Sequence, residues 1–334
     1  MNAFRPTSTI SRQPRSSGRS LGNWLVILVP ALWLVAFFAV PFLTVLKLSF
    51  SEAALALPPY VPVLDLSEGW TGLRDFVSGL TLDGYRLLFS DQLYWMSYLR
   101  SLTIALTSTA ILLLIGYPLA YGIARAPRRV QPILMIGIIL PFLTAFLIRI
   151  YAWMNILQRD GLLNELLLAL GIVSTPPVWI STDPAIYIGM VYTYLPFMVL
   201  PLYASLERMD HTLLEAASDL GCPRWKSFWL VTVPLSGPGI VAGSLLCFIP
   251  IMGEFVIPDL LGGSHSMMIG QTVWLEFFDN RDWPVASALA IVMLLVLLVP
   301  ILLYQRLQTR EMAAEAAART PRATAGPAQA GEAP

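Results

Sequence analysis

The stretch Glu207–Ser227, ERMDHTLLEAASDLGCPRWKS, is a charged segment set between two long apolar ones. It contains seven charged residues, and each would cost roughly 3 kcal/mol at the centre of a membrane helix. Apolar residues recur within it at helical spacing: Leu213, Leu214, Ala217 and Leu220. Gly221 and Pro223 then form a typical helix end. We therefore expect a short amphipathic helix, 212–220, exposed to solvent between two membrane spans.

The composition indicates an integral membrane protein. The chain is 56% hydrophobic and 13% charged, with a mean hydropathy of +0.67. A helix needs about 20 apolar residues to cross the hydrocarbon core. The sequence predicts an all-α fold with six transmembrane helices: 24–46, 98–123, 130–151, 185–206, 237–260 and 284–304. The first is too long for the apolar region of a cleaved signal, so we expect it to be a retained anchor.

Three parts are expected along the chain. The tails 1–22 and 311–334 lack apolar periodicity and are predicted to be disordered. Residues 23–310 form one membrane domain, which includes an outer segment, 47–97, with short helices, and the charged loop 207–236. Residues 161–171, GLLNELLLALG, form either another short amphipathic helix or a simple connecting loop.

Lysine and arginine set the orientation of the spans. If both termini are cytoplasmic, fourteen of the 21 basic residues lie on the inner side: Arg5, Arg12, Arg15, Arg19, Arg125, Arg128, Arg129, Arg208, Arg224, Lys226, Arg306, Arg310, Arg319 and Arg322. The positive-inside rule then places the 207–236 loop in the cytosol. Most acids fall outside, where they would attract a cation, but this is also the ordinary complement of the rule.

Several chemistries are excluded by the sequence. The chain has no P-loop motif, since neither of its lysines, Lys47 and Lys226, follows a glycine. We expect His211 and His265 on opposite sides of the membrane, and Cys222 in the cytosol away from Cys247 in a span, which predicts neither a metal site nor a disulfide. No catalytic serine set is apparent. The chain is expected to be no enzyme, to bind no cofactor and to need a partner for any ATP-driven work.

Acidic residues in the fifth span are the first candidates for a substrate path. Glu254 lies in the outer half of 237–260, and Asp259 lies at its rim. A carboxylate at this depth is costly unless it faces water or a partner. Because Pro250, Gly253 and Pro258 flank Glu254, we expect the helix to break there. The alternative role for Glu254 is a structural ion pair with Arg149.

Aromatic residues are the second candidates. Tyr151 and Trp153 follow Arg149, and Tyr192 and Tyr194 lie in the fourth span. Such residues most often belong to the aromatic belt at the membrane surface. In the alternative, they face the path and hold an ammonium group by cation–π contact.

The charged loop also resembles a known motif. Glu215-Ala216-Ala217, three residues, Gly221, nine residues and Val231-Thr232-Val233-Pro234 are similar to the EAA loop of ABC-importer permeases, with mild departures at Val231 and Val233. In that family this loop holds the coupling helix, which docks on a separate ATPase subunit. The resemblance assigns a coupling role to a set of six residues: Glu215, Ala216, Ala217, Gly221, Arg224 and Pro234.

Further segments narrow the resemblance. FLIRIYAWMNIL (146–157), YIGMVYTYLPFMVLPLY (187–203) and GEFVIPDLLGG (253–263) are similar to the spermidine/putrescine branch of these permeases, above all to its putrescine permeases. The resemblance implies a type I importer (MetI-like) fold in a bacterial inner membrane. It also implies a heterodimer with a second permease, two copies of an ATPase that hydrolyses ATP, and a periplasmic polyamine-binding protein, with no nucleic-acid partner.

Other functions stay open on the sequence. The cargo could be spermidine or another organic cation instead of putrescine. A secondary transporter driven by an ion gradient would also have apolar spans and intramembrane acids, but has no use for an EAA helix. A non-transporting membrane scaffold or receptor component would show no flux of substrate at all.

Overall fold

The structure, a computed structural model, describes residues 21–63, 69–210, 212–263 and 266–319. The described chain is mostly helical. It divides into two units, with the boundary along the chain between Lys47 and Leu48. His211 and His265 lie outside the described residues, and so does the prediction made for them.

The first unit is one long apolar helix. It comprises α1 (Leu21–Leu34), a π-helical turn η1 (Val35–Ala39) and α2 (Val40–Leu48). Residues Val26–Leu48 are long and apolar enough to cross a membrane, with a hydropathy of 2.6. Large apolar side chains such as Trp33 and Phe37 are exposed on it. A helix that is apolar all round suits a lipid environment, as predicted for the first span.

Two short segments of strand open the second unit, and the sequence did not predict them. β1 (Glu52–Ala53) pairs antiparallel with β2 (Tyr60–Val61), with Glu52 opposite Val61. The short helices expected between 47 and 97 follow as α3 (Gly69–Ser78) and α4 (Asp83–Ser90). Because only two residues pair on each side, the hairpin carries no alternating pattern long enough to be recognised in the sequence.

Three further helices are long and apolar enough to span a membrane. They are α5 (Gln92–Arg125), α9 (Asp183–Glu207) and the Trp283–Arg306 part of α16 (Trp283–Arg319). α9 remains one helix through Pro196 and Pro201. These positions agree with the predicted spans, although α5 begins six residues before the predicted start of 98.

The other two predicted spans correspond to bent pairs of helices, each apolar enough to be one span if the pair is counted together. In the first, α6 (Gln131–Ile139) and the 3₁₀ turn η3 (Leu140–Leu143) meet α7 (Phe146–Ile156) at 91°. The sequence predicted one span here, 130–151, and did not indicate a bend. The bend follows Pro141, which has no backbone N–H, and Thr144 is extended and donates its N–H to the Pro141 carbonyl at 3.4 Å.

The second bent pair begins at Arg224, 13 residues before the start of the predicted fifth span, 237–260, whereas the break expected near Glu254 is present. α11 (Arg224–Ser227), η4 (Phe228–Thr232) and α12 (Val233–Leu235) meet α13 (Gly237–Met252) at 63°. α13 ends at Met252, and α14 (Val256–Leu261) follows after a break. The rest of the described chain forms α8 (Leu162–Ala169), α10 (Thr212–Asp219), α15 (Ile269–Trp274) and a π-helical turn, η5 (Leu275–Asp279).

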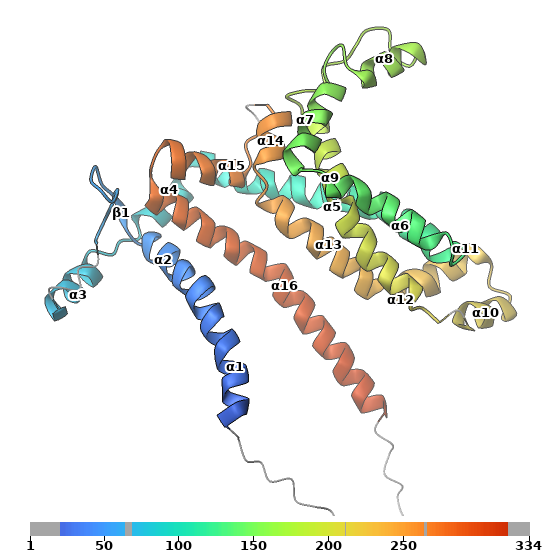
Figure 1. Ribbon diagram of the computed structural model, residues 1–334, viewed down its shortest axis with the longest axis horizontal. Coiled ribbons are helices and arrows are strands. Elements are labelled where there is room, and N and C mark those ends of the chain that lie inside the picture. Colours follow the sequence, from blue (N-terminus) through green and yellow to red (C-terminus); the bar gives the residue numbers. More distant parts are fainter. Residues whose placement is uncertain (1–20, 64–68, 211, 264–265, 320–334) are drawn as a thin grey trace, which may run out of the picture. The chain divides into compact units, whose positions relative to one another are not determined.

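The core of this unit lies between α5, α9 and α13, which make the most extensive contacts with one another (Figure 1). Glycines allow α13 to approach α9 closely. A Cβ atom on Gly239 would lie 2.5 Å from Ser205 Cβ and 2.9 Å from the Pro201 carbonyl oxygen, and one on Gly243 would lie 3.0 Å from Met198 Sδ. The two helices that flank the charged loop are therefore packed backbone against backbone.

The C-terminal tail departs from its prediction. α16 continues to Arg319, so that the run Glu311–Arg319, EMAAEAAAR, is helical although 311–334 was predicted to be disordered. This run consists mostly of alanine and glutamate, which have high helix propensity without any apolar periodicity. Residues 320–334 lie outside the described chain, as does the predicted N-terminal tail up to residue 20.

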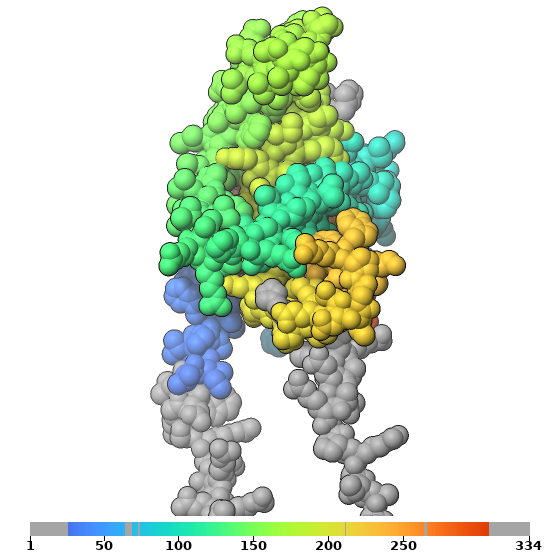
Figure 2. Space-filling view, turned by 90° about the vertical axis from the view of Figure 1, so that its right-hand side faces the viewer, coloured from blue at the N-terminus to red at the C-terminus, as the bar shows by residue number. Residues whose placement is uncertain are grey.

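α8 and α10 lie beyond opposite ends of α9 (Figures 1 and 2). α8 comes shortly before the start of α9, and α10 follows its end. α9 has 25 residues, so its two ends are about 37 Å apart at ~1.5 Å per residue. This distance exceeds the roughly 30 Å of a bilayer core, so one membrane crossing separates α8 from α10.

We predict that Gly239→Ala destabilises the protein by about 1–3 kcal/mol, because the added methyl group collides with the backbone of α9. The effect is measured as a lower melting temperature in detergent. Gly122→Ala is the matched control, since nothing lies within 4 Å of a Cβ atom there. Equal melting temperatures for the two variants would contradict the close packing of α13 on α9.

Candidate functional site

The charged loop forms the predicted helix, α10, and its own sequence caps both ends. At the N-terminus, Asp210 Oδ1 accepts a hydrogen bond from the Thr212 N–H at 3.0 Å. At the C-terminus, the Cys222 N–H donates to the Ala217 carbonyl at 2.9 Å, and the Gly221 N–H donates to the Ser218 carbonyl at 2.8 Å. This is the Schellman arrangement, and Gly221 adopts the positive φ of 76° that it requires.

Most of α10 projects from the molecule. Glu215 and Ala216 are exposed, and Ala217 is half-buried. Leu220 is 89% exposed, and Trp225 in α11 is 71% exposed. Figure 2 shows this region in yellow to orange at the surface. A capped helix with exposed apolar side chains is suited to dock on another protein.

Two other residues of the predicted coupling set lie beyond this helix. Arg224 is exposed at the first position of α11, and Pro234 is exposed in α12, where the chain turns into α13. The six predicted residues therefore lie in one continuous segment, but only Glu215, Ala216, Ala217 and Gly221 belong to α10 and its cap.

An aromatic contact that the sequence did not indicate joins this segment to α5. The Phe228 ring meets the rings of Tyr117 and Tyr121 edge-on, with centroids 5.7 and 5.4 Å apart. Tyr117 Oη also shares a hydrogen bond of 2.9 Å with Ser236 Oγ. Since α10 contacts α11 and η4, a displacement of α10 can reach the core through these side chains.

Glu254 lies in the break between α13 and α14, as predicted. Tyr194 Oη donates a hydrogen bond of 2.6 Å to Glu254 Oε2, and the Phe255 and Val256 N–H groups donate to Oε1 at 3.2 and 3.1 Å. The carboxylate therefore satisfies the free backbone donors at the start of α14. Among the described residues it forms no ion pair with Arg149, so that alternative is not found.

The other predicted path residues are only partly brought together. Trp153 of α7 meets Tyr192 of α9 edge-on at 5.3 Å, whereas Tyr151 is exposed. Asp259 is also exposed, and accepts a 3.4 Å hydrogen bond from Gln271 Nε2. The structure thus groups Glu254 with Tyr194 and Trp153 with Tyr192, but leaves Tyr151 and Asp259 at the surface.

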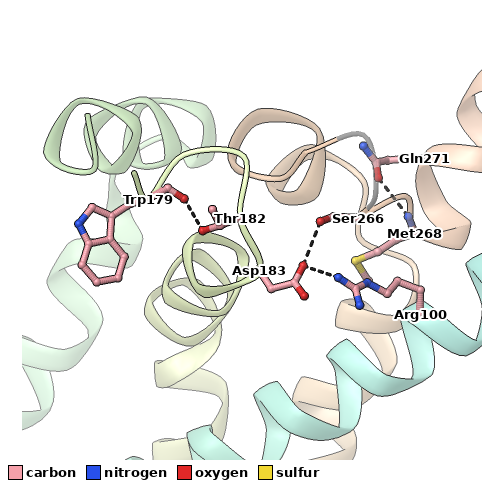
Figure 3. A network of polar contacts seen from close by, with 7 residues as sticks. All are labelled: Arg100, Trp179, Thr182, Asp183, Ser266, Met268 and Gln271. Atoms are coloured by element: carbon pink, nitrogen blue, oxygen red, sulfur yellow. Dashed lines mark hydrogen bonds and ion pairs between the residues drawn. The ribbon is translucent and has the colours of Figure 1, made fainter. Parts of the chain in front are cut away.

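A polar network near the starts of α5 and α9 was not indicated by the sequence (Figure 3). Arg100 of α5 forms an ion pair with Asp183 Oδ1 at the start of α9, and Ser266 Oγ donates to the same oxygen at 3.0 Å. The network joins α5, α9 and the segment before α15. Arg100 lies inside the predicted span 98–123, and a cation in such a span is a sequence signal that could have identified it.

Two buried polar residues, Asn164 and Glu276, join α8 and η5 to neighbouring segments. Asn164 of α8 donates hydrogen bonds to three backbone carbonyls, those of Gln158, Arg159 and Pro177, and accepts one from Trp179 Nε1 at 2.9 Å. Glu276 of η5 accepts hydrogen bonds of 2.9 Å from Tyr94 and Asn280. These contacts fix α8 and η5 beside the ends of the spans.

Asp282 lies next to Glu276 at the start of α16. Burial raises the pKa of the Asp282 carboxyl, and the charge of Glu276 raises it further, whereas the hydrogen bond from the Val285 N–H opposes the shift. Across the residues described, no group of three or more His, Cys, Asp or Glu side chains is placed to hold a metal ion. Asp282 Oδ1 accepts the hydrogen bond of the Val285 N–H at 3.0 Å and so caps the start of α16.

Comparison with known proteins identifies relatives of the whole membrane unit. Residues 113–312 match the family described as "Binding-protein-dependent transport system inner membrane component". The spermidine/putrescine transport system permease protein PotB of Escherichia coli (strain K12) is 44% identical over 226 residues, which cover 68% of this chain and 82% of that protein. PotB of Haemophilus influenzae is 38% identical over 274 residues, which cover 82% of this chain and 90% of that protein.

A solved structure supports the fold. In a crystal structure of a bacterial alginate ABC transporter in complex with its alginate-bound periplasmic protein, one chain superimposes with a TM-score of 0.64. The match covers 86% of this chain and 95% of that chain at 18% identity. This likeness concerns the fold alone, and agrees with the expected type I importer architecture.

We predict that Gly221→Val frays α10 without melting the rest of the protein. A β-branched residue at this φ costs about 1–2 kcal/mol, but a Cβ atom there has no neighbour within 4 Å. Hydrogen exchange of residues 212–222 should accelerate at least fivefold while the global melting temperature stays constant. Unchanged exchange would show that the cap does not depend on glycine.

Proposed function

We propose that this chain, which belongs to the family of binding-protein-dependent transport system inner membrane components, forms half of the pore of an ATP-driven importer of linear polyamines. The observation that carries the proposal is its identity of 38–44% with permeases named for spermidine and putrescine. The similarity to the Haemophilus protein extends over 82% of this chain, and so includes nearly all of the spans.

Orientation follows from charge. The basic residues beside α10 and between α5 and α6 belong on the cytoplasmic side of the inner membrane. α10 then faces the cytosol, and α8, one membrane crossing away, faces the periplasm. Both termini lie in the cytosol in this arrangement. The periplasmic side would carry the docking surface for the polyamine-binding protein, formed by α3, α4 and α8.

ATP hydrolysis belongs to a separate subunit in this proposal. The sequence has no P-loop, whereas α10 is a capped helix that leaves Glu215 and Leu220 exposed. Two copies of an ATPase would bind the EAA loops, one the loop of this chain and the other that of a second, related permease. In this arrangement the exposed surface of α10 would be covered by the ATPase, while its caps at Asp210 and Gly221 define its ends.

The structure offers a path for the motion. When the ATPase dimer closes, α10 moves with it, and α11 and Phe228 transmit the displacement to Tyr117 and Tyr121 of α5. α9 and α13 flank the loop and are packed too closely at Gly239 to slide freely. We therefore expect α9 and α13 to move together as a rigid pair that opens the path on the periplasmic side.

Glu254 is the proposed contact for the ammonium groups of the polyamine. Its negative charge offers a dication a lower-energy route than lipid does. In this structure its oxygens already accept three hydrogen bonds, so the carboxylate is stable without cargo. Binding that must compete with these donors is modest, as a transport site requires for release.

A reconstitution experiment tests the proposal. The chain is purified with the second permease and ATPase encoded beside it, placed in proteoliposomes with the binding protein, and assayed with putrescine and spermidine in turn. Both polyamines should stimulate ATP hydrolysis and enter the vesicles. Uptake that persists without ATP would instead identify a secondary transporter, and the absence of flux with all subunits present would identify a scaffold.

In the same vesicles, we expect Glu254→Gln to slow polyamine uptake at least tenfold, because it removes the charge while preserving shape. Tyr194→Phe removes one hydrogen bond but keeps the carboxylate, so it should slow uptake far less. Both variants are normalised to protein abundance. If the glutamine variant loses uptake only in proportion to its abundance, then Glu254 has a structural role.

The two cysteines provide a test of topology. Cys222, beside α10, is half-buried, and Cys247, in α13, is fully buried. A membrane-impermeant maleimide should label the chain in inverted vesicles stripped of ATPase and should not label it in intact spheroplasts. Cys222→Ser should abolish labelling. Labelling in spheroplasts would place α10 in the periplasm and refute the orientation.

A further inference from the structure

A row of five aromatic rings lies between the start of α16 and the break after α13. The rings contact one another in succession, with centroids 4.2 to 5.4 Å apart at each step. In order, this aromatic row consists of Trp283, Phe277, Phe278, Trp274 and Phe255. Because Phe255 directly follows Glu254 in the chain, the row ends at the residue next to the proposed contact for the cargo.

The aromatic row is packed against the fold at both of its ends. A Cβ atom on Gly270 of α15 would lie 2.5 Å from the Gly253 carbonyl oxygen and 2.7 Å from that of Glu254, so α15 lies directly against the break. At the other end, the ring of Trp283 also contacts that of Tyr60 in β2, with centroids 6.2 Å apart. The row therefore runs from the β-hairpin to the break that contains Glu254.

Two cavities make the rings accessible. The larger, about 1080 Å³, lies between the hairpin segment 53–59 and the turn before α16, and Phe277 and Phe278 line it. A smaller cavity of about 240 Å³ shares these two rings and is also lined by Phe255. Phe278 is 53% exposed and Trp274 is 44% exposed. A small molecule in the larger cavity can therefore contact the row from its side.

The larger cavity suits a flexible chain that carries positive charges. The hairpin segment 53–59 supplies alanine, leucine and proline side chains, and Asp282 supplies a half-buried carboxylate. The exposed cation Arg281 lines the cavity as well. However, the whole turn 276–283, EFFDNRDW, contains three acidic residues and one basic residue. The net negative charge of this turn favours a cation over an anion.

An aromatic belt at the membrane surface is the other common reason for exposed rings. Such belts consist mainly of tryptophan and tyrosine, whose polar edge lies among the lipid headgroups. Three of the five rings in the aromatic row belong to phenylalanine, which has no polar edge. A belt also needs no contact between its members, whereas every ring here contacts the next. These two features favour a path for cargo over a membrane anchor.

We infer that the aromatic row is the entry path of the polyamine, whose ammonium groups pass from the larger cavity toward Glu254 by contact with successive rings. The inference rests on the proposed function, which supplies the cargo and places the start of α16 on the periplasmic side. A ring face attracts an ammonium group without carrying a full opposite charge, so each contact is weak and reversible. The methylene segments of the cargo bury apolar surface against the same rings.

Fluorinated phenylalanines test the inference, because each fluorine weakens the attraction between a ring and a cation but hardly changes the shape of the ring. Phe278 is replaced with mono-, di- and trifluorophenylalanine in the reconstituted transporter. Uptake at a low concentration of cargo-loaded binding protein should fall with each added fluorine, by about threefold or more in the trifluoro variant. The melting temperature should stay constant.

Phe38 provides the matched control for this series. It lies in η1 of the first span, outside the aromatic row, and is 68% exposed. Fluorination there should give no trend in uptake. Constant uptake across the Phe278 series in vesicles whose wild type imports polyamine would overturn the inference. Wild-type vesicles that import no polyamine would instead refute the proposed function.

A pair of substitutions separates the ring from its bulk. Phe278→Tyr keeps the ring and should retain at least half of the wild-type uptake, whereas Phe278→Leu keeps an apolar side chain and should lose about threefold or more at equal abundance. Equal uptake by the two variants would contradict the inference. So would loss of the second permease from the purified Phe278→Leu complex, which would assign the ring to a subunit interface.

Discussion

The cost of placing charge in hydrocarbon is the constraint on which this structure depends. The charged residues of 207–227 cannot enter the membrane, while the residues on either side must. The segment therefore lies outside the membrane, in the connection between α9 and α13, two helices that pack closely at Gly239. This constraint produces a solvent-exposed helix between two closely packed spans. A subunit that binds this helix can move both spans together.

The same constraint explains how polar side chains inside the membrane unit are treated. Glu254, Glu276 and Asn164 each have hydrogen-bond partners within the chain, and Asp183 has an arginine and a serine. Each partner set joins separate elements, so that satisfaction of the polar group also fixes the fold. Arg149 is different, because its guanidinium lies over the rings of Phe142 and Phe146 and forms no ion pair among the described residues.

Local features of the fold could be predicted from the sequence. The helix at 212–219, its end at Gly221 and the break around Gly253 all depend on residues that are neighbours along the chain. Glycine and proline act on their own backbone, so their effects are visible without a structure. The four unbroken apolar spans were located to within six residues for the same reason, since length and hydropathy determine them.

The contacts between distant segments could not be predicted. Arg100 and Asp183 are 83 residues apart, and Tyr94 and Glu276 are 182 apart; no spacing rule joins such pairs. The 91° bend after Pro141 was missed because proline within an apolar run permits a kink without fixing its angle.

The coupling role of α10 can be tested with a photo-crosslinking amino acid at Ser218, which is exposed on that helix, in the intact transporter. We expect a crosslink to the ATPase subunit. A crosslink only to a periplasmic protein or to lipid would contradict it.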